Sequence, residues 1–205
     1  MATPPPSLFD LSPLQPEGFD YRPDFISAAE ERALIAELER LPFKPFEFHG
    51  YLGKRRVVYF GHRYDFGGGG LGEAPEIPPF LLPVRDKAAA FAELTATELP
   101  HVLVTEYQPG AGIGWHRDRP EFGQVVGVSL GAPCVFRLRR REGRGWRRAS
   151  VTLEPRSAYR LAGSARAEWE HSIPSGEALR YSLTFRTLKA TDVQPARTTP
   201  STASP

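Results

Sequence analysis

The clearest pattern of polar and apolar positions lies at residues 180–186, where the two kinds of residue alternate strictly. Side chains of a β-strand point alternately to its two faces, so this segment predicts a strand with one apolar and one polar face. The apolar face carries Tyr181, Leu183 and Phe185, and the polar face carries Arg180, Ser182, Thr184 and Arg186. Because an unpaired buried guanidinium is very costly, two arginines on an inward face need anions as partners.

Shorter runs of the same kind predict a series of strands from residue 101 onwards, at the spacing typical of an all-β sandwich. The expected strands are Val102–Tyr107, Gly114–His116, Gln124–Leu130, Cys134–Arg139, Arg148–Leu153, Ala158–Leu161, Glu170–Ser172 and Arg180–Leu188. A further short strand is expected at Phe19–Pro23.

Two stretches before residue 100 predict helices. Ser27 and Glu30 form a capping box, and apolar residues then recur at helical spacing until Pro42. This helix is expected to cover the outside of the sheet. The second helix is expected to begin at Pro83 and to continue to about Leu99.

The length of 205 residues fits one domain with tails. Residues 1–16 are expected to be a flexible Pro-rich arm and residues 189–205 a disordered tail. No apolar run approaches the ~20 residues that span a bilayer, and the N-terminus lacks the pattern of a signal peptide. We therefore expect a cytoplasmic monomer without membrane association. The single cysteine, Cys134, lies among apolar residues and is interpreted as packing.

His116 and Asp118 are two positions apart and would share one face of an extended segment. A metal site then needs a third ligand, and His171 is the only later histidine. Two imidazoles and one carboxylate form the facial triad of non-haem Fe(II) oxygenases, which leaves positions open for a cosubstrate and O2.

The two arginines of the C-terminal strand indicate the cosubstrate. Arg180 and Arg186 would have Cα atoms about 20 Å apart, at roughly 3.3 Å per residue. With both side chains reaching inward, the remaining gap is close to the length of a five-carbon diacid, which arginine is suited to bind. A diacid beside such an iron site suggests 2-oxoglutarate.

Four blocks in this order resemble the AlkB family of Fe(II)/2-oxoglutarate oxygenases. They are Tyr107–Gly110, His116–Asp118, Gly163–Ile173 and Arg180–Arg186. The resemblance implies a mainly β (α+β) fold, with a double-stranded β-helix or jelly-roll core at residues 100–188 and flanking helices. It also implies Fe(II) on His116, Asp118 and His171, 2-oxoglutarate held by Tyr107, Arg180 and Arg186, and O2 as co-reactant. Thr105 stands where the family often has Asn, and Ser182 is a further candidate for the cosubstrate site.

Residues 17–99 are expected to hold the helices and a substrate-recognition lid. The segment 51–66 mixes bases with aromatic residues and resembles the lid of AlkB homologues that modify tRNA. The candidate substrate-binding residues here are Arg55, Tyr59, His62 and Tyr64, with Val58 and Phe60 in the core. A half-buried strand would explain the same pattern, and Gly67–Gly70 is expected to be a mobile loop.

Seven arginines fall within residues 137–148, with glycines between them, as in two strands joined by a hairpin. They could bind phosphates, and Trp146 could add stacking, or they could form a solvated edge that discourages strand pairing. Candidate substrate contacts are Arg137 and Arg139, together with Arg117 and Glu121. The AlkB prototype has an acid just past the iron motif, where this chain has Pro120.

Three functional hypotheses follow. The first is an oxidative demethylase of alkylated DNA or RNA that releases formaldehyde, succinate and CO2, and therefore has nucleic acid as its partner. The second keeps the oxygenase chemistry but hydroxylates a tRNA nucleoside, a methylated protein or a small molecule. The third is a non-catalytic jelly-roll binding module, against which the complete triad and both arginines argue.

Overall fold

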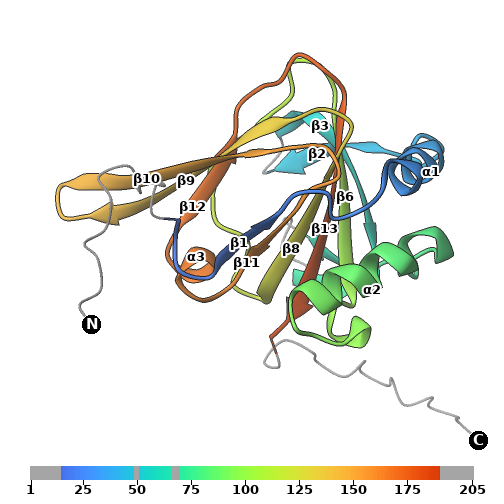
Figure 1. Ribbon diagram of the computed structural model, residues 1–205, viewed down its shortest axis with the longest axis horizontal. Helices are drawn as coiled ribbons and strands as arrows, with labels where there is room; N and C mark the ends of the chain where they lie inside the picture. The colour runs from blue at the N-terminus through green and yellow to red at the C-terminus, as the bar shows by residue number, and fades with distance from the viewer. Residues whose placement is uncertain (1–14, 49–50, 66–69, 190–205) are drawn as a thin grey trace, which may run out of the picture.

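Two antiparallel sheets form the body of the protein (Figure 1). The computed structural model describes residues 15–48, 51–65 and 70–189. The large sheet has the strand order β1-β11-β8-β13-β6-β3-β2, the smaller sheet has the order β10-β9-β12-β7, and β4 pairs only with β5. The arrangement is a double-stranded β-helix, or jelly roll, with flanking helices, as the sequence predicts.

The strands of the large sheet are β1 (Phe19–Arg22), β2 (Lys44–Phe48), β3 (Tyr51–Phe60), β6 (His101–Tyr107), β8 (Phe122–Leu130), β11 (Ala158–Leu161) and β13 (Arg180–Leu188). Those of the smaller sheet are β7 (Ile113–His116), β9 (Cys134–Glu142), β10 (Gly145–Leu153) and β12 (Glu170–Ile173), and the separate pair is β4 (His62–Asp65) and β5 (Gly70–Glu73). The predicted strands after residue 100 are all present, although β9 and β10 are longer than expected and extend away from the body as one hairpin (Figure 1).

Strand β13 lies at the centre of the large sheet, between β6 and β8. Its apolar face belongs to the core beneath the helices, whereas Ser182, Thr184 and Arg186 face the space between the sheets. Both faces are therefore buried, and the alternation decides which residues reach the site.

Helices α1 (Ala28–Leu38) and α2 (Leu82–Phe91) cover the outer face of the large sheet (Figure 1). The capping box is present, because Ser27 Oγ accepts from the Glu30 backbone N–H and Glu30 accepts from that of Ser27. Helix α2 is shorter than predicted. Glu93 has φ +59°, a left-handed conformation that ends the helix, and a separate 3-10 turn follows at Ala96–Glu98.

The N-terminal region contributes more than helices and a lid. Strands β1, β2 and β3 are hydrogen-bonded members of the large sheet, so residues 17–99 share that sheet with residues 100–188. The alternative of a half-buried strand therefore holds for β3, in which Val57 and Phe60 are buried and Val58 packs against the core.

Within the described ranges, no helix has the length and apolar character needed to cross a membrane. Most of the expected Pro-rich arm, most of the expected C-terminal tail and most of the glycine run lie outside the described residues. Cys134 is free and half-buried.

Candidate active site

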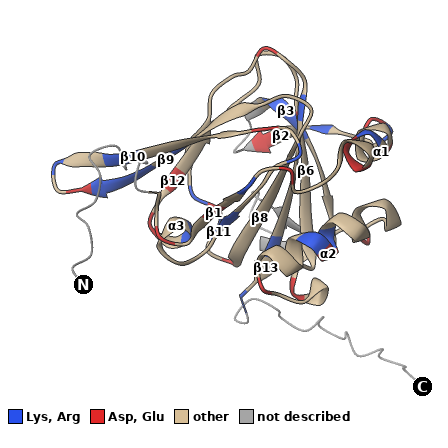
Figure 2. Ribbon diagram, viewed as in Figure 1, with Lys and Arg blue, Asp and Glu red and all other residues tan. Residues whose placement is uncertain are grey.

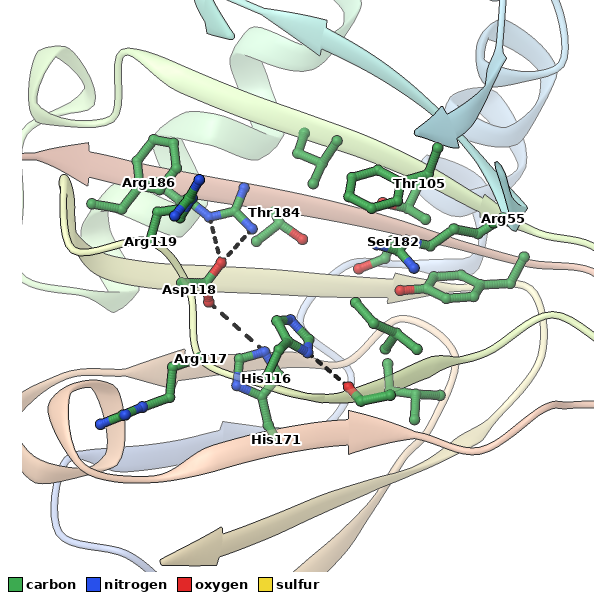
Figure 3. A pocket seen from close by; sticks show the side chains of 18 of the residues that line it. Arg55, Thr105, His116, Arg117, Asp118, Arg119, His171, Ser182, Thr184 and Arg186 are labelled. Carbon is green, nitrogen blue, oxygen red and sulfur yellow. Dashed lines mark hydrogen bonds and ion pairs between the residues drawn. The ribbon is translucent and has the colours of Figure 1, made fainter. Parts of the chain in front are cut away.

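A cavity of about 570 Å³ lies between the two sheets and is lined by residues of both (Figure 3). We call it the active-site pocket. Of the residues singled out in the sequence, it is lined by Arg55, Tyr59, Thr105, Tyr107, His116, Arg117, Asp118, His171, Ser182 and Arg186. Segments more than 100 residues apart in the chain are thus brought to one site.

The three candidate metal ligands lie next to one another in this pocket. His116 of β7 and His171 of β12 are paired in register, and their ring centroids are 4.2 Å apart. Asp118 follows β7, and its Oδ2 lies 3.8 Å from His171 Nε2. In the described part of the chain, no three His, Cys, Asp or Glu side chains already have their donor atoms gathered as around an ion. The three residues of the triad are therefore adjacent in the pocket.

Both imidazoles are held in the neutral form, which is the form that binds metals. Burial lowers the pKa of His116, and it lowers the pKa of His171 to about 3. The Nδ1–H of His116 donates to the Gly114 carbonyl at 2.9 Å, which leaves the lone pair of Nε2 available. Burial is the largest single influence and would raise the pKa of Asp118, but the charges of Arg186, the two histidines and Arg166 together outweigh it, and the net shift is downward. The donor set is therefore two neutral imidazoles and a carboxylate.

Arg186 orients the carboxylate. Its Nε and Nη2 both donate to Asp118 Oδ1, at 3.0 and 2.7 Å, which leaves Oδ2 directed toward His171 (Figure 3). Its Nη1 donates to Nε2 of His101 at 3.0 Å, and the Nδ1–H of His101 then donates to the His62 carbonyl at 2.7 Å. This tautomer follows because a guanidinium can only donate. A continuous chain of hydrogen bonds therefore runs from β4 through β6 and β13 to Asp118.

His101 is not among the site residues predicted from the sequence, and it is 1% exposed. Its backbone partner is placed by Gly61, which has φ +76° at the junction of β3 and β4. A Cβ at Gly61 would lie 1.8 Å from the Pro100 carbonyl oxygen, so only glycine allows this close approach. In the sequence, the glycine before His62 was therefore the feature that could have indicated the contact between His101 and the His62 carbonyl.

We expect His101→Leu to weaken both folding and the site. The substitution leaves the Arg186 Nη1–H and the His62 carbonyl without partners, which costs at least about 1–3 kcal/mol in the free energy of unfolding. Affinity for metal and cosubstrate should fall by roughly 10–100-fold, because Arg186, which orients Asp118, loses the partner of its Nη1. Urea denaturation and metal titration measure the two effects. His62→Ala is the matched control, since it keeps the accepting backbone carbonyl; an equal loss in both variants would contradict the assignment.

The buried histidines also predict how the stability of the metal-free protein depends on pH. Burial lowers the pKa of His101 and that of His171 to about 3 each, from 6.5 in an unperturbed imidazole. Between these values the unfolded chain binds more protons, so the stabilisation is complete above pH 6.5 and is lost as the pH falls toward 3. Each ring contributes a slope of up to ~1.4 kcal/mol per pH unit. Urea denaturation across this window should show the fall, with a smaller slope in His101→Leu; a flat profile would contradict it.

Arg180, the other arginine of the polar face, is placed differently from Arg186. It is 3% exposed, its Nε donates to Ser129 Oγ at 3.1 Å, and its Nη1 and Nη2 are buried without hydrogen-bond partners. It lines a neighbouring cavity of about 410 Å³, which we call the Arg180 cavity, and Tyr107 and Ile173 line both cavities. The Arg180 guanidinium lies over the Tyr107 ring, 5.0 Å from its centroid. Two unsatisfied cationic donors at the far end of the site fit the distal carboxylate of a diacid.

The structure separates the predicted substrate-binding residues. Arg55, Tyr59 and Arg117 line the active-site pocket, whereas the His62 ring does not and lies 3.5 Å from the Pro100 carbonyl. Glu121 is half-buried outside the pocket. Neither His62 nor Glu121 lines the active-site pocket, and their contact with the substrate stays a prediction. The side chain of Tyr64 lies outside the described residues.

Arg137 and Arg139 also lie outside the pocket wall, but both flank Trp115, which lines it. Three further residues line the pocket without having been predicted from the sequence: Trp115, Phe46 and Arg119. Trp115 was next to the iron motif, and its position before His116 was the signal that could have identified it.

Known proteins resemble this chain in sequence and in fold. The family described as the 2OG-Fe(II) oxygenase superfamily matches residues 18–186. The chain is 28% identical over 194 residues to the "Alkylated DNA repair protein ALKBH8 homolog" of Arabidopsis thaliana, covering 83% of this chain and 54% of the relative. It is 36% identical over 111 residues to the "Probable RNA/DNA demethylase ALKBH6" of Danio rerio, covering 52% and 43%. The chain thus spans about half the length of these relatives.

Among solved structures, that of OsALKBH1 superposes with a TM-score of 0.64 at 17% identity, over 83% of this chain and 96% of that one. This likeness shows the fold. The chain belongs to the 2OG-Fe(II) oxygenase superfamily, and its relatives place it in the AlkB family. It is a 2-oxoglutarate-dependent dioxygenase whose cofactor and cosubstrates are Fe(II), 2-oxoglutarate and O2.

Proposed function

We propose that the protein oxidatively demethylates N-methylated bases of nucleic acid. In this assignment His116, Asp118 and His171 hold Fe(II), and 2-oxoglutarate lies along β13 between Arg186 and Arg180, beside Thr105, Tyr107 and Ser182. The observation that carries the choice of nucleic acid is a row of stacked arginine and tryptophan side chains that leads from the pocket to the β9–β10 hairpin.

The row begins at Trp115 in the pocket wall. The Arg139 guanidinium lies 4.3 Å from the ring centroid of Trp115 and 4.2 Å from that of Trp146, on the opposite strand of the hairpin. Arg141 follows, 5.3 Å from the Trp146 ring. Arg139 is held in place by Glu170, which accepts from its Nε at 2.6 Å. Alternating cations and aromatic rings of this kind bind phosphates and stack on bases.

The hairpin extends this surface beyond the body of the protein. In Figure 2 the ribbon of β9 and β10 is blue at its Lys and Arg positions, and this hairpin lies at the opposite side of the molecule from α1. Arg141, Arg144 and Arg148 are exposed. A polyanion lying along the hairpin would be directed toward Trp115, where an extruded base could enter the pocket. This favours phosphate contact over the alternative of a solvated edge.

The side chains of the pocket give the reaction its geometry. Tyr59, Phe46 and Trp115 offer rings for an extruded base, and Arg55 lies 3.8 Å from the Phe46 ring centroid, at the same wall. Arg186 keeps Asp118 oriented, and the apolar lining, which includes Ile113 and Phe136, limits the water around the reacting atoms. Bound Fe(II) with 2-oxoglutarate and O2 supplies the oxidising chemistry that hydroxylates the methyl C–H bond. The resulting N-hydroxymethyl group leaves as formaldehyde.

The test is an assay of the full chain with Fe(II) and 2-oxoglutarate on methylated single-stranded DNA, duplex DNA and RNA oligonucleotides, in which succinate and formaldehyde are measured separately. Equal amounts of both products, dependent on the methylated base, are expected. Succinate with an oxidised base but no formaldehyde would replace demethylation by hydroxylation of a nucleoside. Turnover that ignores every oligonucleotide but responds to a protein or metabolite would overturn the proposal.

We also expect the hairpin arginines to set nucleic-acid affinity. Replacing Arg141, Arg144 and Arg148 by Glu should weaken oligonucleotide binding and flatten its dependence on salt, because each lost phosphate contact reduces the logarithmic salt slope by about 0.7–0.9. Fluorescence anisotropy at several salt concentrations measures both effects. Arg32→Glu on α1 with Arg40→Glu just after that helix is the control, which also reverses positive charge but away from the hairpin. Equal weakening by both sets would indicate a general charge effect instead.

A further inference from the structure

The Arg180 cavity contains the only cysteine of the chain. Cys134 begins β9 and lies on the same face as Phe136 and Leu138, which are buried, whereas its neighbour Val135 is 44% exposed on the other face. Cys134 therefore points inward, and it lines the Arg180 cavity together with Tyr107 and Arg180. Its position was interpreted from sequence as packing, and it does pack against the smaller core cluster. The Cys134 side chain therefore borders both the smaller core cluster and the Arg180 cavity.

Arg180 independently indicates that this cavity receives an anion. Its two unpartnered nitrogens are buried, and among the described lining residues the only other charged side chain is Glu177, which is exposed at the rim. The segment 174–178 also lines the cavity, and its residues 175–178 are exposed. We take this exposed edge as the route by which small anions approach Arg180 without crossing the active-site pocket.

A second route to the cosubstrate site matters because, in the proposed function, nucleic acid covers the other side of the active-site pocket. A base that occupies the space near Arg55 and Trp115 would block entry of small molecules from that side. Tyr107 and Ile173 form the shared wall between the two cavities, so a diacid with one carboxylate at Arg180 lies where the cavities meet. A group attached to Cys134 would occupy the space in which that carboxylate must sit.

We infer that Cys134 is a modification site that controls the cosubstrate: exchange of its thiol with a small disulfide places a group in the Arg180 cavity and excludes 2-oxoglutarate. In this reaction the Cys134 thiol loses its proton to solvent, and Sγ attacks one sulfur of the disulfide. The S–S bond of the reagent breaks, a new Sγ–S bond forms, and the second sulfur leaves as a thiolate with the electron pair. The reaction is reversed by any free thiol in excess. The inference rests on the proposed position of 2-oxoglutarate at Arg180.

The electrostatics of the cavity favour reagents that carry a carboxylate. Burial raises the pKa of the Cys134 thiol, and the nearby Arg180 charge partly opposes this. Exchange should therefore be slow near neutral pH and faster in alkaline solution, where more thiolate is present. An anionic reagent would gain from Arg180, as the diacid does.

The experiment uses the full chain with Mn(II) in place of Fe(II), so that no turnover occurs, and dithiobis(nitrobenzoate) as an anionic disulfide. Released nitrothiobenzoate, followed by absorbance, reports only Cys134 because the chain has one cysteine. Saturating 2-oxoglutarate should slow the release by at least roughly tenfold, which corresponds to about 1.4 kcal/mol. The modified protein should bind 2-oxoglutarate at least roughly tenfold more weakly, and dithiothreitol should restore binding.

The controls are a Cys134→Ser variant, which should neither react nor lose 2-oxoglutarate binding, and the same variant with Ser150→Cys. The second places a thiol at an exposed position of β10 that lines neither cavity, where it should react without protection by 2-oxoglutarate and without effect on binding. No release from the folded protein, no protection, or equal loss of binding through position 150 would each overturn the inference. None of these measurements uses a nucleic acid. Protection without demethylation would therefore reject only the proposed substrate, and demethylation without protection would reject only the role of Cys134.

Discussion

Replacement of Asp118 by Ala is expected to abolish 2-oxoglutarate turnover. The substitution removes the one carboxylate of the triad and leaves the Arg186 guanidinium, now 7% exposed, facing two histidines without an anion. Even changes beyond the ligands themselves typically reduce affinity or activity by ~10–100-fold, so the loss here should exceed roughly 100-fold. Succinate formation at saturating Fe(II) and 2-oxoglutarate is the measurement, and activity close to that of the parent would reject the assignment of the metal site.

Because a buried ion pair that loses one partner costs about 3–5 kcal/mol, Asp118→Ala could fail by unfolding. Asp118→Asn separates the two effects, since it keeps an oxygen that accepts from Arg186 but removes the charge. We expect it to remain folded by circular dichroism and still to lose turnover. Asp20→Asn is the control of the same chemical type: Asp20 pairs with Arg160 at 2.7 Å on β1 and β11, outside the active-site pocket, and its loss should leave turnover intact.

The strands and the inward residues of β13 were predictable because period-two alternation is a local property of the sequence. From the sequence, His171 could be placed beside His116 only because a metal site needs a third ligand. The register that places them opposite each other is a property of β7 and β12 together. Similarly, Arg186 was predicted as a residue of the cosubstrate site, and its contact with Asp118 places it beside the metal ligands.

The features of the site that the sequence did not indicate all depend on contacts between distant segments. His101 looked like an ordinary strand histidine, because nothing local shows that Arg186 and the His62 carbonyl lie on its two sides. The separation of Arg180 into a second cavity depends on where Tyr107 stacks, and the orientation of Trp115 depends on the arginines of β9. The same holds for His62 and Glu121, each of which lies close in sequence to residues of the pocket wall but outside that wall.

Replacement of Arg180 by Met is expected to weaken 2-oxoglutarate binding without lowering the free energy of unfolding. Each charge-assisted hydrogen bond is worth about 1.5–3 kcal/mol, so loss of two to the distal carboxylate should weaken 2-oxoglutarate binding by roughly 100-fold or more. Metal binding should be little changed, because Arg180 does not contact the triad. The KM for 2-oxoglutarate and a Mn(II) titration measure these two effects.

The free energy of unfolding of the ligand-free Arg180→Met protein should be unchanged or higher than that of the parent. Arg180 carries a buried charge whose Nη1 and Nη2 have no partner, and an unbranched apolar side chain of similar length removes that cost while giving up one hydrogen bond to Ser129. Urea denaturation without small anions in the buffer tests this. Arg160→Met is the control, since it removes a half-buried arginine paired with Asp20 and should cost up to about 1 kcal/mol without affecting 2-oxoglutarate. A large loss of stability in Arg180→Met would mean that the guanidinium serves the fold, whereas lost binding with retained stability means that its partner is the diacid.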